Sequence, residues 1–286
     1  MDSQRKGSIL VLVSAISFGL MPIFARLAYS EGVDVQELLL ARFLLAFLIT
    51  GIFLKMSSKF SVPSTRQLFV LLALGGFGYF LQSTLYFTAL LYIPVSLVAL
   101  TLYTYPAFVL AGSLILGLEK ISISVVLSLL LAITGLFLVA NPVLEVAGLG
   151  ILIGLGAAIT YTVYILVSTV VLKGVSGEVG SFYVMGAASL SFFVSNLLTN
   201  DLHFVWNFEA WIWISMISIV CTFIAITTFF QGVKEIGASR ASILSSTELV
   251  TSVLVASLIF SDILNLAQLL GGALIFLASI LATLKK

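Results

Sequence analysis

Charged side chains are scarce in this chain of 286 residues: Asp, Glu, Lys and Arg make up 9% of it, against 61% hydrophobic residues. A soluble domain carries roughly 25% charged residues. A chain so poor in charge cannot cover its surface for water. The composition therefore excludes a soluble globular fold and predicts an integral membrane protein.

Cysteine and histidine occur once each, as Cys221 and His203. A single cysteine inside an apolar run excludes a disulfide framework and a cysteine-based metal cluster. A single histidine, with no paired carboxylates at a useful spacing, argues against a membrane-embedded enzyme. No Walker motif is present, so ATP does not drive the protein directly. We therefore expect no catalytic residues, no metal and no cofactor.

The chain also lacks basic tracts and long polar connections. Its formal net charge is +1, so the sequence gives no sign of a strongly basic surface that would bind nucleic acid. Every connection between apolar runs is short, so no domain outside the membrane could hold a separate activity. The partners we expect are the lipid bilayer and a small-molecule substrate, with the chain acting as a monomer or a weak dimer.

What the chain has in abundance is apolar runs of helical length. About 20 apolar residues cross a bilayer as a helix, whereas barrel strands would alternate over segments of about ten residues. Charges, Pro and Gly divide the chain into ten such runs, which predicts an all-α integral membrane fold of ten transmembrane helices. The expected limits are 7–29, 35–56, 67–91, 95–117, 122–141, 147–172, 177–199, 208–233, 238–260 and 264–284.

The basic residues alternate between the connections of this zigzag. Eleven of the thirteen Lys and Arg residues lie before the first run, after an even-numbered run or after the last, while the connections after odd-numbered runs are acidic. Because basic short loops stay in the cytoplasm, we expect a multi-pass protein of the cytoplasmic membrane with both termini inside. The eleven basic residues are Arg5, Lys6, Lys55, Lys59, Arg66, Lys120, Lys173, Lys234, Arg240, Lys285 and Lys286.

Ten runs divide into five plus five, and the two halves share a layout. Residues 86–140 can be laid over 229–283 at an offset of 143, which pairs Ser96 with Ser239, Thr104 with Thr247 and Glu119 with Asp262. Five helices per half make the second half enter the membrane from the opposite face. We expect two inverted repeats, 1–143 and 144–286, in one integrated membrane domain. Secondary transporters use this construction and bind substrate near midplane where the halves meet.

At these residues the chain resembles the drug/metabolite transporter superfamily, and in particular its ten-helix EamA-type members. The resemblance covers nearly the whole chain and implies metabolite transport, often export of amino acids or related compounds. Two departures are Leu249, where relatives commonly have Pro, and Asp262, which is usually Glu. The matching blocks include Leu40-Ala41-Arg42-Phe43, Tyr86-Phe87-Thr88-Ala89-Leu90, Pro94-Val95-Ser96, Tyr105-Pro106-Ala107 and Ser246-Thr247-Glu248.

Glu248 is the first candidate site residue. It lies about ten positions into the ninth run, so at 1.5 Å per residue it is roughly 15 Å deep, near midplane. Ser245 and Ser252 share its helical face at spacings of three and four, which forms a polar stripe toward the bundle interior. Glu248 is either a group that binds a proton or a cation, or a structural residue that pairs with a buried arginine or hydrogen-bonds to a neighbouring helix.

Arg26 and Arg42 are the two basic residues inside apolar runs. Arg26 is close enough to the end of its run to reach the interface. Arg42 lies about seven residues into its run, about 10 Å deep. Either guanidinium could bind a substrate carboxylate, but we favour structural roles, for Arg42 a pairing with Glu37.

Tyrosine and amide side chains form a second set of candidates. Hydroxyls and ring faces suit a cavity that binds and releases a small amphipathic solute, and the alternative for such residues is packing or an interfacial aromatic belt. The predicted pathway or substrate-binding residues are Gln82, Tyr86, Tyr103, Thr104, Tyr161, Tyr164, Gln231, Ser245, Glu248 and Arg42.

Gly76, Gly78 and Pro106 are the candidate hinges. Glycine and proline loosen helices in lipid, provided that the freed backbone groups are satisfied inside the bundle. A static kink or close packing is the alternative at each position.

The function that follows is secondary active transport of small metabolites by alternating access, with a central cavity between the repeats and possible proton coupling. Export is the expected direction. The alternative is a facilitative channel or a uniporter without ion coupling. A channel would need a filter or a charged ring, normally built by oligomeric symmetry.

Overall fold

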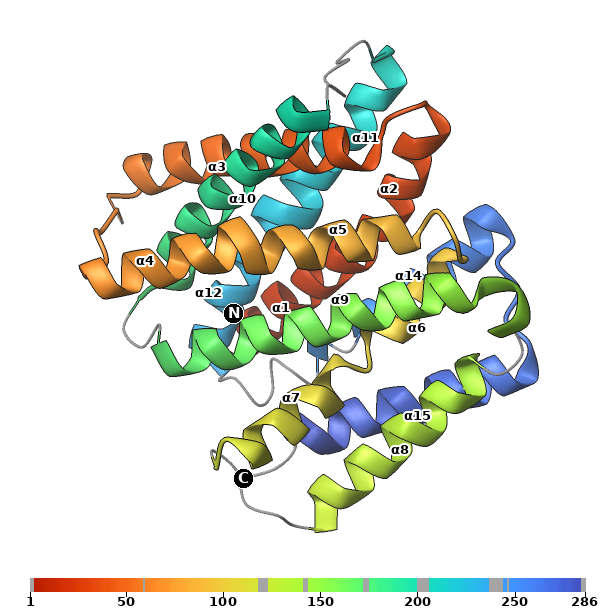
Figure 1. Ribbon diagram of the computed structural model, residues 1–286. Helices are drawn as coiled ribbons and strands as arrows, with labels where there is room; N and C mark the ends of the chain where they lie inside the picture. Colours follow the sequence, from red (N-terminus) through yellow and green to blue (C-terminus); the bar gives the residue numbers. More distant parts are fainter. Residues whose placement is uncertain are drawn as a thin grey trace.

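The computed structural model describes residues 3–58, 60–117, 123–140, 144–171, 175–199, 206–236, 244–245 and 247–283. Within these ranges the regular structure is helical, which confirms the all-α prediction (Figure 1). In chain order the elements are α1 (Ser3–Gly19), α2 (Met21–Ser30), α3 (Val35–Met56), α4 (Thr65–Ala73), η1 (Leu74–Tyr79), α5 (Phe80–Ala89), α6 (Val95–Leu102), α7 (Tyr105–Ile115), α8 (Ile123–Ala140), α9 (Leu144–Val171), α10 (Gly177–Thr199), α11 (Phe208–Ser218), η3 (Ile219–Ile224), α12 (Ala225–Ile236), α14 (Thr247–Phe260) and α15 (Leu266–Thr283).

Each of the ten predicted apolar runs contains one or more of these helices. Among the described residues, six helical stretches are long and apolar enough to cross a membrane: Gln4–Ser30, Val35–Met56, Thr65–Ala89, Gly148–Ser168, Gly177–Thr199 and Phe208–Gly232. Shorter apolar helices cover Val95–Val109, Thr247–Phe260 and Leu266–Ala278. Large apolar side chains such as Ile52, Phe69 and Leu258 are exposed over the surface of the bundle. Exposure on this scale is rare in soluble monomers and is expected where lipid covers the protein.

Local sequence explains where several helices begin. Asp34 caps α3, because its Oδ1 accepts a hydrogen bond from the backbone N–H of Gln36 at 2.7 Å. Asn265 and Gln268 cap α15 reciprocally: each side-chain oxygen accepts from the other residue's backbone N–H, at 2.9 and 3.0 Å. Such caps satisfy amide groups that the helix itself leaves unpaired.

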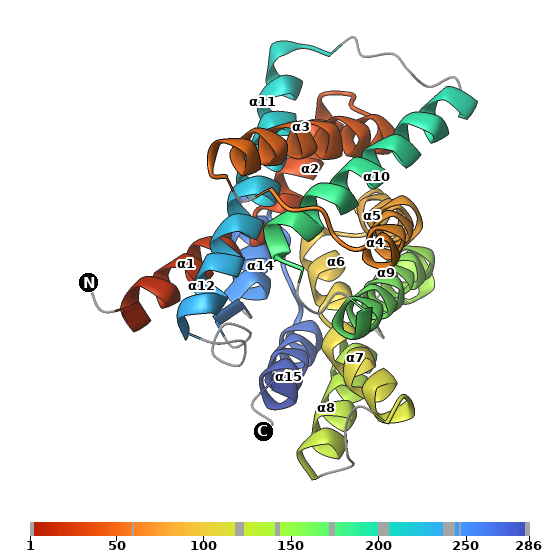
Figure 2. The ribbon, with the colours of Figure 1, turned by 90° about the vertical axis from the view of Figure 1, so that its left-hand side faces the viewer.

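The helices pack in a pattern with approximate two-fold symmetry. The pair α1 with α12 corresponds to the pair α9 with α5, and two further pairs join equivalent helices of the two halves: α3 with α10, and α8 with α15. Helix α6 packs on α14, whose equivalent in the first half is α7. Figure 1 shows α8 and α15 side by side with α7 at the bottom edge of the bundle. In Figure 2, α1, α12 and α14 form one side and α5 and α9 the other, with α3 and α10 above them. Every one of these pairs joins the first half of the chain to the second.

Hydrogen bonds between helices that are distant in the sequence define one end of the bundle. The carboxylate of Asp262, just after α14, accepts from the backbone N–H and the hydroxyl of Ser96 at the start of α6, at 3.4 and 3.5 Å. Arg26 in α2 donates to the carbonyl of Leu90 at 2.8 Å and so caps the C-terminal end of α5. We call this the acidic end, after Glu31, Asp34, Glu209 and Asp262.

Two of the predicted continuous runs are broken. The first run bends at Leu20 between α1 and α2, and the fourth is split at Tyr103 and Thr104 between α6 and α7. Each break is followed at once by a proline in the first turn of the next helix, Pro22 in α2 and Pro106 in α7. Proline lacks the N–H that would continue the preceding helix, and its ring clashes with the carbonyl four residues earlier.

Two other spans continue through a wider turn. The π-helical segments η1 and η3 interrupt the third and eighth runs, at Leu74–Tyr79 and Ile219–Ile224. Single π-helical turns of this kind frequently occur at functional sites.

Some sequence predictions fall on residues outside the described ranges. These are Glu119 and Ser239 of the repeat comparison, His203, and several of the loop cations. The predicted boundary between the repeats, after residue 143, follows directly on residues 141–143, which also lie outside the described ranges, and it stays a prediction.

Gly135 tests how closely α8 and α15 approach. A Cβ at this position would lie 2.6 Å from the carbonyl oxygen of Gly271 and 3.0 Å from the backbone nitrogen of Ile275. We expect Gly135→Ala to lower the thermal midpoint of the purified protein, with a cost of about 1–3 kcal/mol for the displaced backbone.

Gly148→Ala is the matched control, since a Cβ there meets nothing within 4 Å. Alanine favours helix over glycine by about 1 kcal/mol, so this variant should melt at or above the wild-type temperature. Equal melting of the two variants would contradict the close approach.

Candidate functional site

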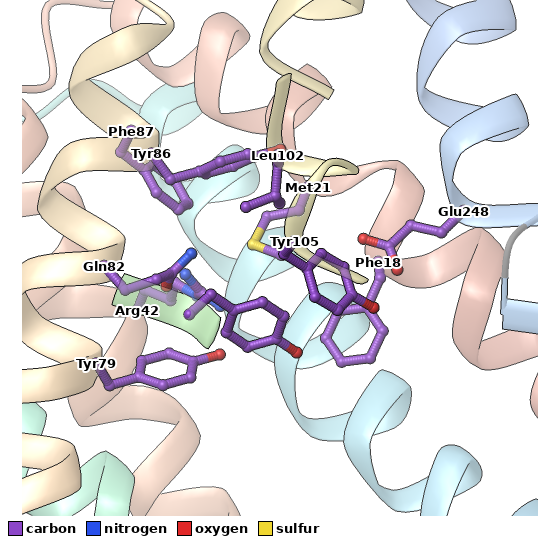
Figure 3. Close-up of a pocket in the computed structure, with 11 residues that line it drawn as sticks. Phe18, Met21, Arg42, Tyr79, Gln82, Tyr86, Phe87, Leu102, Tyr105 and Glu248 are labelled. Atoms are coloured by element: carbon purple, nitrogen blue, oxygen red, sulfur yellow. The ribbon is translucent and has the colours of Figure 1, made fainter. Parts of the chain in front are cut away.

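A cavity of about 90 Å³ lies between the two halves of the bundle (Figure 3). It is far smaller than the roughly 300–1,000 Å³ typical of sites for drug-sized ligands, but it has room for several water molecules. The first half of the chain supplies Phe18, Met21, Arg42, Tyr79, Gln82, Tyr86, Phe87, Leu102 and Tyr105, and the second half supplies Tyr161 and Glu248. The cavity therefore joins one cation and one anion with aromatic and apolar groups.

Arg42 is held on one side of the cavity by neutral groups. Its side chain is 2% exposed, and its Nε donates a hydrogen bond to the Thr222 hydroxyl at 3.0 Å. The Thr222 hydroxyl donates in turn to the carbonyl of Ile217 at 2.9 Å, across the π-helical turn η3. The guanidinium carbon lies 4.7 Å from the ring centre of Phe43 and 5.2 Å from that of Phe87. Aromatic faces attract a cation, but they do not neutralise it.

Glu248 lies on the other side of the cavity, in the first turn of α14. Its Oε2 accepts a hydrogen bond from the Tyr103 hydroxyl at 3.3 Å, and the same hydroxyl lies 3.0 Å from the carbonyl of Ser245. The N-terminal turn of a helix favours a negative charge. No ion pair joins Glu248 to Arg42, both of which belong to the described residues.

Tyrosine rings form a continuous wall between these charges. Tyr105 contacts Tyr161 edge to face at 4.8 Å, Tyr161 stacks with Tyr164 at 6.1 Å, and Tyr164 contacts Tyr79 edge to face at 5.4 Å. Edge-to-face and stacked contacts of this kind stabilise a fixed ring arrangement. Of these rings, Tyr79, Tyr105 and Tyr161 line the cavity, and Tyr164 lies behind them.

The helix breaks lie around the cavity. Phe18 and Met21 flank the break between α1 and α2, Leu102 and Tyr105 flank the break between α6 and α7, and Glu248 follows the start of α14. Irregular backbone at membrane depth is tolerated where it is buried in protein or lines a cavity. Pro22 and Pro106 follow the two breaks, and side chains beside these breaks line the cavity.

Five of the predicted site residues line the cavity together: Arg42, Gln82, Tyr86, Tyr161 and Glu248. We expected Arg42 to form a structural pair with Glu37, but its side chain lines the cavity. That pairing is not formed: Arg42 contacts Thr222 and two rings, and Glu37 accepts a hydrogen bond from the Trp206 indole at 3.0 Å. Glu37 is one and a half turns away along α3, so the two side chains leave the helix on different faces.

The other predicted side chains, Tyr103, Thr104, Tyr164, Gln231 and Ser245, are described residues that are not part of the cavity lining. The Tyr103 hydroxyl donates a hydrogen bond to Glu248 from outside the cavity lining. The Thr104 hydroxyl donates to the carbonyl of Thr101 at 2.7 Å, within the helix break. The expected serine stripe has structural partners as well. Ser252 donates to the carbonyl of Gly19 at 2.8 Å, where α1 ends, and so ties α14 to that break.

The predicted hinge residues occupy irregular backbone. Gly76 and Gly78 lie within η1, where the carbonyl of Gly76 accepts from the Ser191 hydroxyl at 2.8 Å. Pro106 starts α7. Whether any of these positions moves stays a prediction.

Several residues of the site were not found from sequence. Phe18 and Met21 look like ordinary apolar positions of the first span, and Thr222 is one of many hydroxyls. Gly19 packs directly on the backbone of Glu248, since a Cβ there would lie 2.8 Å from that residue's carbonyl oxygen. Pro22 was the available signal, because it marks a break that brings its neighbours to the cavity.

The groups that line the cavity can bind a small polar solute. Within the described residues no group of three His, Cys, Asp or Glu side chains comes together to hold a metal ion. Cys221 is buried behind the site without a disulfide partner. A guanidinium, a carboxylate, a carboxamide and tyrosine hydroxyls can bind a small polar solute from several sides.

Comparison with known proteins places this architecture in a family. The model of the EamA-like transporter family matches residues 5–141 and again 148–284, two stretches with a constant offset of 143 residues. An uncharacterized transporter of Archaeoglobus fulgidus is 27% identical over 279 residues, which cover 98% of this chain and 97% of that protein. The uncharacterized transporter YcbK of Bacillus subtilis is 24% identical over 283 residues, covering 94% of this chain and 90% of that protein.

One crystal structure superposes with a TM-score of 0.69 over 97% of both chains, at 20% sequence identity. At this identity the likeness shows the fold. The family is a ten-helix membrane fold with internal repeats, in agreement with the two inverted five-helix repeats predicted from the sequence.

Thr222 tests how Arg42 is held. We expect Thr222→Val, which keeps the shape but removes the hydroxyl, to leave the buried Nε of Arg42 unsatisfied and to lower the thermal midpoint in detergent, at a cost of about 1–3 kcal/mol. Thr228→Val is the matched control, because the Thr228 hydroxyl bonds only carbonyls of its own helix, that of Ile224 at 2.8 Å. Identical melting of both variants would show that the Thr222 hydroxyl does not support Arg42.

Proposed function

Because the chain belongs to the EamA-like transporter family, it is a membrane transporter, and we propose that it is a secondary active exporter of small metabolites such as amino acids or related compounds. It works across the cytoplasmic membrane by alternating access. The substrate binds in the cavity between the repeats. Both termini lie in the cytoplasm, in accordance with the basic residues at one set of connections.

The observation that carries this proposal is a small polar cavity lined from both halves of an approximately two-fold bundle. A carrier needs a binding site that two rearranging halves share, and Arg42 and Glu248 belong to different halves. A wall of tyrosine rings offers hydroxyls and faces to a solute that must bind and then leave.

The degree of burial along the cavity supports a state that is closed toward the acidic end. Arg42, Tyr86 and Phe87, which lie nearer that end, are buried. Tyr105, Tyr161 and Glu248, farther from it, are half-buried. With the proposed orientation, this is a site closed to the outside, which a solute would reach from the cytoplasm.

The alternative is a facilitative channel or a uniporter without ion coupling. Flux into proteoliposomes separates these functions. For a secondary transporter we expect saturable movement of a metabolite that responds to an imposed ion gradient and shows exchange between internal and external solute. Saturable flux that ignores every gradient would favour a uniporter, and conductance at ion-channel rates would rule out a carrier.

Glu248→Gln tests proton coupling. Glutamine keeps the size of the side chain but cannot take up a proton, so we expect the variant to retain downhill exchange while it loses transport driven by a pH gradient. Glu209→Gln, at an exposed position in the first turn of α11, is the control and should respond like the wild type. An unchanged response of Glu248→Gln to the pH gradient would refute a coupling role for Glu248.

Tyr103→Phe tests the group behind that carboxylate. Removing its hydroxyl deletes the single donor that Glu248 and the Ser245 carbonyl share, so Glu248 should be less well positioned. We expect apparent substrate affinity to fall about three- to tenfold, the equivalent of one hydrogen bond. Tyr183→Phe, a ring packed against Phe182 on α10, is the control. Unaltered affinity in Tyr103→Phe would leave Tyr103 a packing residue.

A further inference from the structure

Arg42 is a buried cation that forms no ion pair with an acidic side chain of the described residues. Its contacts in that part of the chain are the hydroxyls of Thr222 and Tyr79 and the rings of Phe43 and Phe87. A guanidinium stays charged in proteins, and an unpaired buried charge is costly. The neighbouring cavity wall, which includes Tyr79, Gln82 and Tyr86, is neutral too.

The geometry of Arg42 suits a carboxylate. Thr222 holds the Nε, and the rings of Phe43 and Phe87 lie beside the guanidinium, so its orientation is fixed before any ligand arrives. The planar fork of arginine donors matches a carboxylate in a bidentate arrangement.

Glu248 offers the complementary pole. Its carboxylate receives one hydrogen bond, from a neutral tyrosine hydroxyl, and it faces the cavity opposite Arg42 (Figure 3). A primary ammonium group carries three donors and would compensate this charge. A solute with only one charge would leave either Arg42 or Glu248 uncompensated.

The internal repeat has neutral residues at the positions equivalent to both charges. The 143-residue offset relates Phe18 to Tyr161 and Tyr105 to Glu248, and all four residues line the cavity. The same offset relates Arg42 to Met185, a buried neutral residue. Each charge thus occupies a position that its repeat fills with a neutral side chain, so the two charges break the symmetry of the cavity.

The two poles lie at different depths. Arg42 follows the start of α3 at Val35 by seven residues, and Glu248 precedes the end of α14 at Phe260 by twelve. Both helix ends lie at the acidic end, so at 1.5 Å per residue the two Cα atoms are about 10 and about 18 Å from it. Figure 3 shows Met21 and Tyr105 between the two charged side chains. In an α-amino acid the carboxylate and the ammonium group are attached to the same carbon, so they cannot contact Arg42 and Glu248 at the same time.

We propose that the cavity binds a linear ω-amino acid, with its carboxylate on Arg42, its ammonium group on Glu248 and its methylene chain against Met21, Leu102 and Tyr105. The proposal rests on the transport function above and specifies the substrate of that same site. A cavity of about 90 Å³ limits the chain to a few methylene groups.

The wild-type protein tests this without any mutation. The probes are glycine, β-alanine, 4-aminobutyrate, 5-aminopentanoate and 6-aminohexanoate, with butylamine and butyrate as singly charged analogues. Thermal stabilisation of the purified protein and counterflow in proteoliposomes are measured for each. We expect an optimum at an intermediate chain length, with glycine and both singly charged analogues weaker by at least about tenfold, since each loses one charge-assisted contact.

Two variants assign the poles. Glu248→Gln should shift preference toward butyrate relative to 4-aminobutyrate, and Arg42→Gln should shift it toward butylamine. Such opposite changes in specificity would not follow from a general loss of packing. Glu209→Gln and Arg66→Gln, which alter exposed charges, are the matched controls and should keep the wild-type order.

The outcomes separate the substrate from the transport function. A flat length profile, a preference for glycine, or an analogue with one charge that binds as well as the zwitterion would overturn the ω-amino acid proposal. If none of these solutes moves but another metabolite shows saturable counterflow, the transporter stands and the proposed substrate does not. If a broad metabolite mixture gives no counterflow at all, both proposals fail.

Discussion

The lipid bilayer offers no hydrogen-bond partner to the backbone, and the rest of this structure depends on that constraint. Helices satisfy their own amides and carbonyls, so every departure from helix must be accommodated inside the protein. The breaks beside Pro22 and Pro106 occur where several helices surround the cavity, and Ser252 satisfies the carbonyl of Gly19 at the first of them. The same constraint that forbids irregular backbone toward lipid therefore concentrates it at the site.

The approximate two-fold symmetry of the bundle arranges the helices around the site, and the positions where the two halves differ supply its charged groups. Equivalent helices of the two halves pack as pairs, so the midplane region is built twice from related pieces. Tyr105 and Glu248 occupy equivalent positions after equivalent helix starts, yet one is neutral and the other is acidic. Arg42 likewise has Met185 as its equivalent. A cavity between such halves combines a symmetric scaffold, which two alternating states require, with a polar axis that recognises one orientation of a solute.

Much of the architecture could be predicted from the sequence. Run length gives helices, loop charges give the number of spans, and a 143-residue offset gives the repeat. The residues inside the site were harder to predict from the sequence. Glu248 stood out because a carboxylate in an apolar run is rare, and Gln82 and Tyr86 because polar groups recur at helical spacing. Tyr103 contacts Glu248 and does not line the cavity itself. Helical periodicity assigns a residue to a face of its helix but does not show whether a neighbouring side chain covers it.

The all-helical class, the ten spans and the positions of the intramembrane charges follow from the order of residues alone, since hydropathy and helical periodicity act locally along the chain. Which of these groups meet depends on how the helices pack in three dimensions. Arg42 and Glu248 are 206 residues apart, and the sequence suggested a nearby acid, Glu37, as the partner of the arginine. Packing between the halves leaves Arg42 without an acidic partner among the described residues and sets Glu248 across a cavity from it. Contacts between distant helices are fixed by side-chain fit in three dimensions.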